Sequence, residues 1–295
     1  MRKSFLSPAK INLGLSIVGR RETGYHNLES LFWPLNFGDT ITLSLGDSQV
    51  RVQWDKSAPF SKTELPAEQD NIVTKVLNLL PNLESKWIVE ISKQIPIGGG
   101  LGGGSSNIGT ILKFFRENNI VQITDLEPWA AQFGADIPFF LHSRPAWVTG
   151  IGENIQALEI EPALTQKLYF LLIVFPFGCE TKSIFKEFKI RNSTFTPSTL
   201  PFANKRVTES AFLSYLARAK NDLEPIVCDL YPQIGLVLDR LKSLDCLWSG
   251  LSGSGATCFA LFDSKESREE TAKDLQPFFR LNNCRSIFAE TFATH

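Results

Sequence analysis

Cysteine and histidine are scarce in this chain, and their positions argue against two kinds of site. The five cysteines lie far apart, form no Cys-x-x-Cys pair and are odd in number, which argues against a disulfide framework. The three histidines, His26, His142 and His295, are scattered without the spacing of a metal-binding motif. The sequence therefore predicts a reduced protein and offers no histidine-based metal site.

The chain also lacks an excess of charge and a long apolar run. Its net charge is −1 at pH 7, so no basic field attracts nucleic acid, and any positive charge that binds phosphate must be local. The longest apolar stretch, around Leu168–Phe177, is about half of the roughly 20 residues that a membrane-spanning helix needs. The basic N-terminal residues are not followed by the apolar segment of a signal peptide. We therefore expect a cytoplasmic protein whose partners are neither nucleic acid nor membrane.

Apolar residues make up 43% of the 295 positions, enough to form sizeable cores. At this length we expect one large or two medium-sized domains, and we place a boundary between an N-terminal domain, residues 1–156, and a C-terminal domain, residues 157–295. The last strand could return to the N-terminal domain. Strand-like and helix-like patterns alternate in mixed order, which predicts an α+β fold.

The expected elements follow from these patterns. Strands are expected at Ser4–Leu6, Ile11–Ile17, Thr40–Leu45, Val50–Trp54, Trp87–Ile91, Leu168–Phe175, Ala256–Phe262 and Ser286–Phe292. Helices are expected over residues 71–80, 126–133, 209–219, 222–227, 231–244 and 265–279, and directly after a glycine run near residue 100. Residues 57–69 are expected to form a surface loop, and residues 191–206 a loop or mobile flap.

The glycine run is the most informative segment. Six of the chain's 20 glycines lie between Gly98 and Gly104, after an expected strand and before an apolar helical pattern. Ser105, Ser106 and Asn107 follow directly and are residue types that favour a helix N-cap. Because the N-terminus of a helix presents unpaired N–H groups and the positive end of the helix dipole, this arrangement predicts a phosphate-binding loop.

Other interpretations of the run are less consistent with its surroundings. A Walker A loop needs a lysine after the last glycine, where this chain has Ser105. A GxGxxG pattern is present, but so dense a run matches many spacings by chance. A flexible Gly-Ser linker is the remaining alternative, and the strand and helix patterns on either side argue against it.

Two polar residues near the N-terminus are candidates for a functional site. Lys10 and Asn12 alternate with Ile11 and Leu13, which places both polar side chains on one face of a strand. An exposed edge strand would show the same pattern, since exposed lysines are common. Tyr25 and His26, which follow a charged turn, could stack on and hydrogen-bond a planar base, or be ordinary loop residues.

Asp136 is a third candidate. It precedes Ile137-Pro138, a signature of a helix start in which the aspartate caps and the proline occupies the first turn. A carboxylate near a lysine can instead accept a proton from a hydroxyl group. Late in the chain, Ser249–Gly255 forms a second Gly-Ser turn, which is either a second glycine clamp or a tight turn between elements.

Taken together, these motifs resemble the GHMP kinase superfamily, which has an N-terminal strand, a glycine-serine phosphate loop and a late glycine-rich turn in this order. The resemblance covers nearly the whole chain. Its most specific blocks are Pro8–Leu15, Gly19–His26, the doubled glycine loop, Gly134–Leu141 and Ser252–Ala256, with Gly150–Glu153 and Asn221–Pro225 in addition. It implies a two-domain GHMP fold, with an ATP-binding N-terminal domain, a substrate-binding C-terminal domain and the active site in the cleft between them.

The resemblance also implies roles for individual residues. Asp136 is the catalytic carboxylate and Lys10 its neighbour; Asn12, Tyr25, His26, Thr181 and Phe185 bind the acceptor, with a cytosine between Tyr25 and Phe185 and His26 at its edge. ATP-binding residues are Pro96, Gly98, Gly99, Gly100, Gly102, Gly103, Gly104, Ser105 and Ser106, with Asn71 and Lys93 near the nucleotide. Mg²⁺ is expected with ATP, and the resemblance assigns no protein ligand to it.

The branch of the family with these motifs phosphorylates the 2-hydroxyl of 4-diphosphocytidyl-2-C-methyl-D-erythritol, an acceptor that carries a cytidine diphosphate group. A GHMP kinase for another small alcohol, such as mevalonate, is the first alternative. It has no use for a nucleobase pocket of the kind that Tyr25, His26 and Phe185 suggest. A catalytically silent nucleotide-binding protein is the second, and the presence of Lys10, Asn12 and Asp136 argues against it.

Overall fold

The computed structural model describes residues 2–60, 65, 67, 71–81, 83, 86–191, 194–199, 201–202 and 204–293. The expected loop over residues 57–69 lies largely outside these ranges, and residues 192, 193, 200 and 203 of the loop over residues 191–206 lie outside them too.

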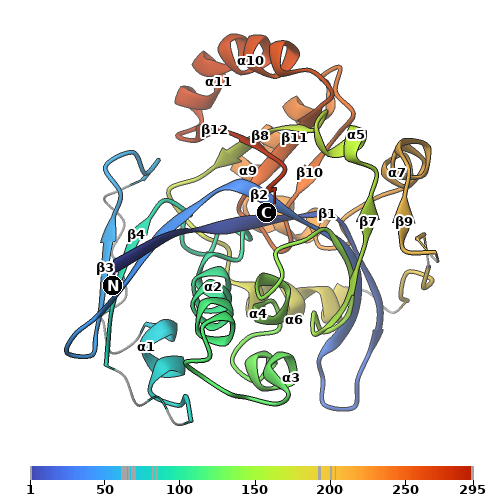
Figure 1. Ribbon diagram of the computed structural model, residues 1–295. Coiled ribbons are helices and arrows are strands. Elements are labelled where there is room, and N and C mark those ends of the chain that lie inside the picture. The colour runs from blue at the N-terminus through green and yellow to red at the C-terminus, as the bar shows by residue number, and fades with distance from the viewer. Residues whose placement is uncertain are drawn as a thin grey trace.

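A six-stranded sheet, the first sheet, organises the N-terminal half (Figure 1). Its strands are β1 (Arg2–Arg20), β2 (His26–Leu45), β3 (Gln49–Trp54), β4 (Trp87–Lys93), β5 (Ala146–Gly150) and β6 (Asn154–Ala157). The order is β3-β4-β2-β5-β6, and β1 pairs along β2. All neighbours are antiparallel except β3 and β4.

The two longest strands differ from the expectation. Instead of separate strands at 4–6 and 11–17, β1 is one strand of 19 residues with register shifts, one of them between Pro8 and Lys10. The strand expected at 40–45 is only the end of β2, and His26, expected in a loop, begins β2 after a turn. Most residues from Leu28 to Leu35 are buried on both faces, so this part of β2 has no polar-apolar alternation that could reveal it.

The second sheet has four antiparallel strands, β8 (Tyr169–Val174), β10 (Trp248–Leu251), β11 (Cys258–Phe262) and β12 (Arg285–Glu290), in the order β10-β11-β8-β12. A short parallel pair joins β7 (Glu159–Ile160) to β9 (Arg206–Val207). After β12, Thr291 bridges to Leu35 of β2, and the Phe292 N–H donates to Pro34 O over 3.0 Å. The last strand therefore belongs to the second sheet, and the residues that follow it bond to the first.

Helices pack against both sheets. They are α1 (Ile72–Leu77), α2 (Gly103–Glu117), α3 (Leu126–Ala131), α4 (Ile137–Phe140), α5 (Pro162–Thr165), α6 (Thr181–Arg191), α7 (Glu209–Leu216), α8 (Glu224–Leu230), α9 (Pro232–Lys242), α10 (Lys265–Asp274) and α11 (Gln276–Leu281). The helix expected over 265–279 is divided, because α10 ends at Asp274 and α11 starts anew with Pro277 in its first turn. Among the described helices, none has both the length and the apolar character required to cross a membrane.

In Figure 1, α1–α4 and α6 lie on one side of the long β1–β2 pair, and the second sheet with α10 and α11 lies on the other. One apolar core belongs to the N-terminal half alone and joins β2 and β4 to α2. The other two cores combine both halves: Phe32 and Phe140 share one with Leu171, and Trp33 shares the other with Phe170. The first sheet ends at Ala157, while these cores continue across that point, so the division at residues 156 and 157 stays a prediction.

Candidate active site

The glycine run forms a loop that packs closely against the turn after β10 and against α4. Gly98, Gly100 and Gly102 have positive φ angles of 67°, 75° and 74°, which glycine adopts without strain. A Cβ atom on Gly100 would lie 2.2 Å from Ser252 O, and one on Gly102 would lie 2.7 Å from the Phe140 ring. The glycines are therefore required both by backbone conformation and by close packing.

The helix after this loop begins earlier than expected. Its first residue is Gly103, and its N-cap is Gly102 rather than a serine. The N–H groups of Gly103, Gly104 and Ser105 are at the start of the helix, where no carbonyl four residues earlier lies within it. These groups open toward the loop, which is the arrangement that binds a phosphate.

Ser106 and Asn107 form hydrogen bonds to β1 and do not cap the helix. Ser106 is fully buried, and its hydroxyl donates to Pro8 O over 2.6 Å, while the Ser7 hydroxyl donates to Asn107 Oδ1 over 2.9 Å. The Ser106 side chain therefore faces β1 and fastens α2 to it, whereas the glycines and Ser105 line the open side of the loop.

A cavity of about 330 Å³ lies over the loop. Polar lining comes from the glycines, Asn71 and Lys93, and apolar lining from Val52, Leu65, Ile72, Val73, Pro96 and Ile97. Asn71 Oδ1 is engaged as the N-cap of α1, where it accepts from the Val73 N–H over 2.8 Å. Lys93 forms a buried ion pair with Asp39. Sequence reasoning missed Asp39, which is fully buried and also accepts from the backbone N–H groups of Gln94 and Ile95.

Lys10 and Asp136 meet beside this loop. The Lys10 Nζ atom lies 3.5 Å from Asp136 Oδ2, and the Lys10 N–H donates to Leu101 O over 3.0 Å. The amine is buried and lies 4.5 Å from the centre of the Phe32 ring, while the Asp136 side chain is 30% exposed. The alternative of a solvent-exposed edge strand at Lys10 is therefore wrong.

Asp136 does not act as a helix cap. It occupies the N-cap position of α4, but its φ and ψ of −82° and −13° are helical and its side chain makes no capping hydrogen bond. The carboxylate is thus available to Lys10 and to a ligand.

Asn12 orients Lys10. Its Oδ1 atom accepts from Lys10 Nζ over 2.6 Å, and its Nδ2 atom donates to Ser30 Oγ over 2.9 Å. Ser30 in turn donates to Gly14 O over 2.6 Å. Both ends of the Asn12 amide are engaged, so in this structure its contact is with the lysine, and its predicted contact with substrate hydroxyls stays a prediction. Ser30, in the part of β2 that has no visible pattern, was missed.

The late glycine turn closes the site from the second sheet. Ser252 Oγ donates to Gly100 O over 3.0 Å and accepts from the Asn12 N–H over 3.3 Å, and the Thr257 N–H donates to Gly99 O over 3.0 Å. Asn221 holds the turn, because its buried amide donates to both Leu251 O and Gly253 O, over 2.9 and 2.7 Å. The site is therefore built by residues from both sheets.

The aromatic candidates are only partly brought together. His26 stacks on Phe185, with ring centres 5.5 Å apart and planes at 23°, and the edge of Phe188 contacts His26 at the same distance. Tyr25 is 63% exposed, and among the described residues no aromatic ring is in contact with it. The cytosine sandwich between Tyr25 and Phe185 stays a prediction, with His26 already on one face of Phe185. Thr181, at the start of α6, shares a hydrogen bond of 2.8 Å with Ser254 of the late turn.

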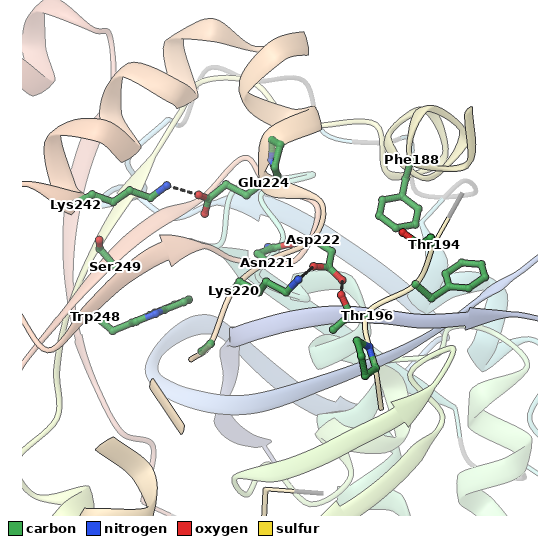
Figure 2. A pocket seen from close by; sticks show the side chains of 14 residues that line it. Phe188, Thr194, Thr196, Lys220, Asn221, Asp222, Glu224, Lys242, Trp248 and Ser249 are labelled. Carbon is green, nitrogen blue, oxygen red and sulfur yellow. Dashed lines mark hydrogen bonds and ion pairs between the residues drawn. The ribbon is translucent and has the colours of Figure 1, made fainter. Parts of the chain in front are cut away.

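A second cavity, of about 660 Å³, lies between α6 and β10 (Figure 2). Its charged side chains are paired with one another: Lys220 with Asp222 at 3.0 Å, and Lys242 with Glu224 at 2.5 Å. Neither the glycine loop nor Asp136 lines it. The smaller cavity is lined by the glycine loop, and the Lys10–Asp136 pair lies beside that loop, since the Lys10 N–H bonds to Leu101 O. We therefore place the candidate active site at the glycine loop, with the smaller cavity over it and the Lys10–Asp136 pair beside it.

The loop over residues 191–206 contributes one wall of that second cavity, and its described part is hydrogen-bonded to its neighbours, while its mobility stays a prediction. The Thr196 N–H donates to Ile17 O over 3.0 Å, and the Thr196 hydroxyl to Asp222 over 2.7 Å (Figure 2). Farther along, the Thr199 N–H donates to the buried carboxylate of Glu29 over 2.8 Å. These bonds tie residues 196–199 to β1 and β2.

Comparisons with known proteins agree with this geometry. The GHMP kinases N terminal domain family matches residues 71–144, and the GHMP kinases C terminal family matches residues 205–280. The chain is 36% identical over 290 residues to the 4-diphosphocytidyl-2-C-methyl-D-erythritol kinase of Pelodictyon phaeoclathratiforme, covering 95% of this chain and 94% of the relative. It is 31% identical over 280 residues to the enzyme of that name in Anaplasma marginale, covering 92% and 91%.

Solved structures give the same result. A crystal structure of a 4-(cytidine 5'-diphospho)-2C-methyl-D-erythritol kinase superposes with a TM-score of 0.74 at 27% identity, covering 98% of this chain and all of the other. The homoserine kinase of Cytophaga hutchinsonii shares the fold, with a TM-score of 0.67 at 20% identity over 98% of this chain and 94% of its own. The predicted α+β fold of the GHMP type is thus confirmed, and the chain belongs to the GHMP kinase family.

Proposed function

We propose that this protein transfers the terminal phosphoryl group of ATP to the 2-hydroxyl of 4-diphosphocytidyl-2-C-methyl-D-erythritol. The observation that carries the proposal is the Lys10–Asp136 pair, 3.5 Å apart, at the edge of a glycine loop that opens into a helix N-terminus. Phosphoryl transfer needs mainly positioning and electrostatic stabilisation, and these groups supply both. Full-length similarity to relatives with this named activity supports the choice of acceptor.

The donor binds over the glycine loop. The N–H groups of Gly103, Gly104 and Ser105 and the positive end of the α2 dipole bind its phosphates. The apolar wall formed by Val52, Leu65, Ile72 and Ile97 is suited to the adenine ring. ATP supplies the phosphoryl group that is transferred.

Asp136 and Lys10 divide the work at the reacting hydroxyl. Asp136 accepts the proton of the 2-hydroxyl group. At the same time the hydroxyl oxygen bonds to the terminal phosphorus of ATP, and the bond from that phosphorus to the ADP oxygen breaks. Lys10 stabilises the negative charge on the transferring group. Asn12 holds the lysine in place between them through its 2.6 Å hydrogen bond.

Mg²⁺ is part of the proposal as the usual companion of ATP. Among the described residues, no group of three or more His, Cys, Asp and Glu side chains could hold a metal ion. A magnesium ion would therefore be held mainly by the phosphate oxygens of ATP and by water. The ion would neutralise phosphate charge.

Cytosine recognition falls to the region of Tyr25, His26 and Phe185. Burial first, and then the charges of Arg20 and Lys189, lower the pKa of His26 below 6.5, so its ring is neutral at pH 7. A neutral imidazole has one donor and one acceptor, which matches the mixed edge of cytosine. The proposal includes a cytoplasmic location, where ATP is present and the five unpaired cysteines remain reduced.

The test is a product assay with three acceptors. The protein is incubated with ATP, Mg²⁺ and either 4-diphosphocytidyl-2-C-methyl-D-erythritol, mevalonate or homoserine, and products are identified by mass spectrometry and phosphorus NMR. We expect ADP and a new phosphomonoester only with the cytidyl alcohol. Phosphorylation of mevalonate instead would support the first alternative, and ATP binding without any turnover would support the silent nucleotide-binding protein.

A further inference from the structure

The turn before β2 is closed by Arg21. The Arg21 N–H donates to Tyr25 O over 2.8 Å, and the Gly24 N–H donates to Arg21 O over 2.9 Å. Gly24 has a φ of 92°, which favours glycine at this point of the turn. The turn carries Tyr25 and leads directly into His26, so Arg21 is bonded within the segment that presents both residues.

The Arg21 side chain extends from this turn to Glu153 in the turn after β5. Its Nη2 atom lies 2.5 Å from Glu153 Oε1, and its Nε atom donates to Asn27 Oδ1 over 2.8 Å. The two charged side chains are 37% and 25% exposed. Burial alone raises the pKa of Glu153, but the hydrogen bond from Arg21 and those from the backbone outweigh it and lower that pKa.

Glu153 shapes the turn after β5. Its Oε2 atom accepts from the Ile151 N–H over 2.5 Å, and its carboxylate lies over Gly150, where a Cβ atom would be 2.3 Å from Oε2. The next glycine, Gly152, faces the catalytic carboxylate: a Cβ atom there would lie 3.4 Å from Asp136 Oδ1. The turn that Glu153 holds is therefore a wall of the site at Asp136.

We propose that Arg21 and Glu153 form a positioning pair that fixes the turn carrying Tyr25 and His26 relative to Gly152 and Asp136. The inference rests on the proposed function and adds a role for two residues that contact neither ATP nor the reacting hydroxyl. When the cytosine ring binds at the turn with Tyr25 and His26, this pair aligns the reacting hydroxyl of the acceptor beside Gly152 and Asp136. Binding energy from a part of the substrate that does not react is thereby used at the reacting centre.

An ordinary surface ion pair contributes little and serves as the comparison. Arg116 and Glu127 form such a pair at 3.1 Å, with side chains 38% and 43% exposed, and join α2 to α3. They resemble Arg21 and Glu153 in chemistry and exposure, but they do not shape either turn. Glu127→Gln is therefore the matched control for Glu153→Gln.

The first experiment separates the two substrates. Glu153→Gln retains the shape of the side chain and an acceptor for Ile151, and it removes the charge that binds Arg21. We expect kcat/KM for 4-diphosphocytidyl-2-C-methyl-D-erythritol to fall about tenfold in Glu153→Gln and in Arg21→Gln, while KM for ATP stays within about twofold. Glu127→Gln should leave both constants unchanged. Equal losses toward both substrates would overturn the proposal.

The double variant tests whether the residues act as one unit. If they do, Arg21→Gln combined with Glu153→Gln loses about as much as either single variant, about tenfold, because the connection is already broken. A loss of about a hundredfold, the product of two independent effects, would contradict the pair.

Calorimetric titration with CMP measures binding without turnover. It therefore tests the positioning pair independently of the proposed kinase activity. CMP is expected to bind about tenfold more weakly to both single variants than to the wild-type protein. If the wild-type protein fails to phosphorylate the cytidyl alcohol, the proposed function is wrong, whatever the variants do. If it succeeds and Glu153→Gln matches it in turnover and CMP affinity, the positioning pair is wrong.

Discussion

Lys10 Nζ lies 3.5 Å from Asp136 Oδ2, although the two residues come from different parts of the chain, a long strand and the start of a four-residue helix. The contact forms because Gly102, whose Cβ would touch both the Lys10 side chain and the Phe140 ring, allows β1 and α4 to approach the same loop. The backbone of Asp136 is helical, and its carboxylate makes no capping hydrogen bond. The carboxylate is therefore available for catalysis.

Replacement of the carboxylate should therefore abolish catalysis without unfolding the protein. Asp136→Asn keeps the size of the side chain and removes the proton acceptor, so we expect kcat to fall by roughly 10²–10⁴-fold. KM for ATP and the melting temperature should stay close to the wild-type values, because the carboxylate makes no capping bond. Turnover within a few-fold of wild type would contradict the role of Asp136.

Lys10→Met tests the other partner. The amine is buried against Phe32 and bonded to Asn12, and methionine fills a similar volume without charge. We expect kcat to fall by about 10²-fold or more, since a preorganised cation is lost from the reacting centre. Steady-state kinetics at saturating ATP measure this, and circular dichroism shows whether the fold is kept. A loss seen only in KM for the acceptor would assign Lys10 to binding.

Parts of this site could be predicted from the sequence where the residues that contact one another lie close together along the chain. Lys10 and Asn12 share one face because of strand alternation, which the structure confirms through their 2.6 Å hydrogen bond. The glycine loop between a strand and a helix was predictable because its strand, glycines and helix are consecutive. The start of the helix was misplaced, since Gly102 with its positive φ caps α2 and the serines fall inside the first turn.

Contacts between distant segments escaped sequence reasoning. Asn221 lies 30 and 32 residues before the carbonyls it holds, and Ser252 lies 240 residues after Asn12. No local pattern marks such pairs. The buried stretch of β2 that contains Ser30 lacks alternation, so its polar residues could not be assigned to a face.

The close contact between the two glycine turns gives a prediction about stability. In Gly100→Ala, the new Cβ would lie 2.2 Å from Ser252 O at a φ of 75°, so the backbone must shift. We expect a loss of roughly 1–3 kcal/mol in the free energy of unfolding and a raised KM for ATP. Gly104→Ala is the control for stability, since its Cβ would make only an ordinary contact of 3.4 Å with Ile72. Equal unfolding free energies for the two variants in urea titrations would argue against this interlocking.

The lowered pKa of His26 predicts how acceptor binding depends on pH. Because burial and two nearby cations place the folded pKa below 6.5, the ring stays neutral as the pH falls from about 8 to 6.5, and KM for the cytidyl acceptor should be constant there. Below pH 6.5 the unfolded chain takes up a proton that the folded protein resists, so stability falls as the pH decreases toward the folded pKa. Acceptor KM should rise in that same range, and His26→Gln should remove both effects because glutamine does not titrate. Acceptor KM and thermal melts measured together across this range test the prediction, and a rise in KM that is already complete by pH 6.5 would show that the folded pKa is not lowered.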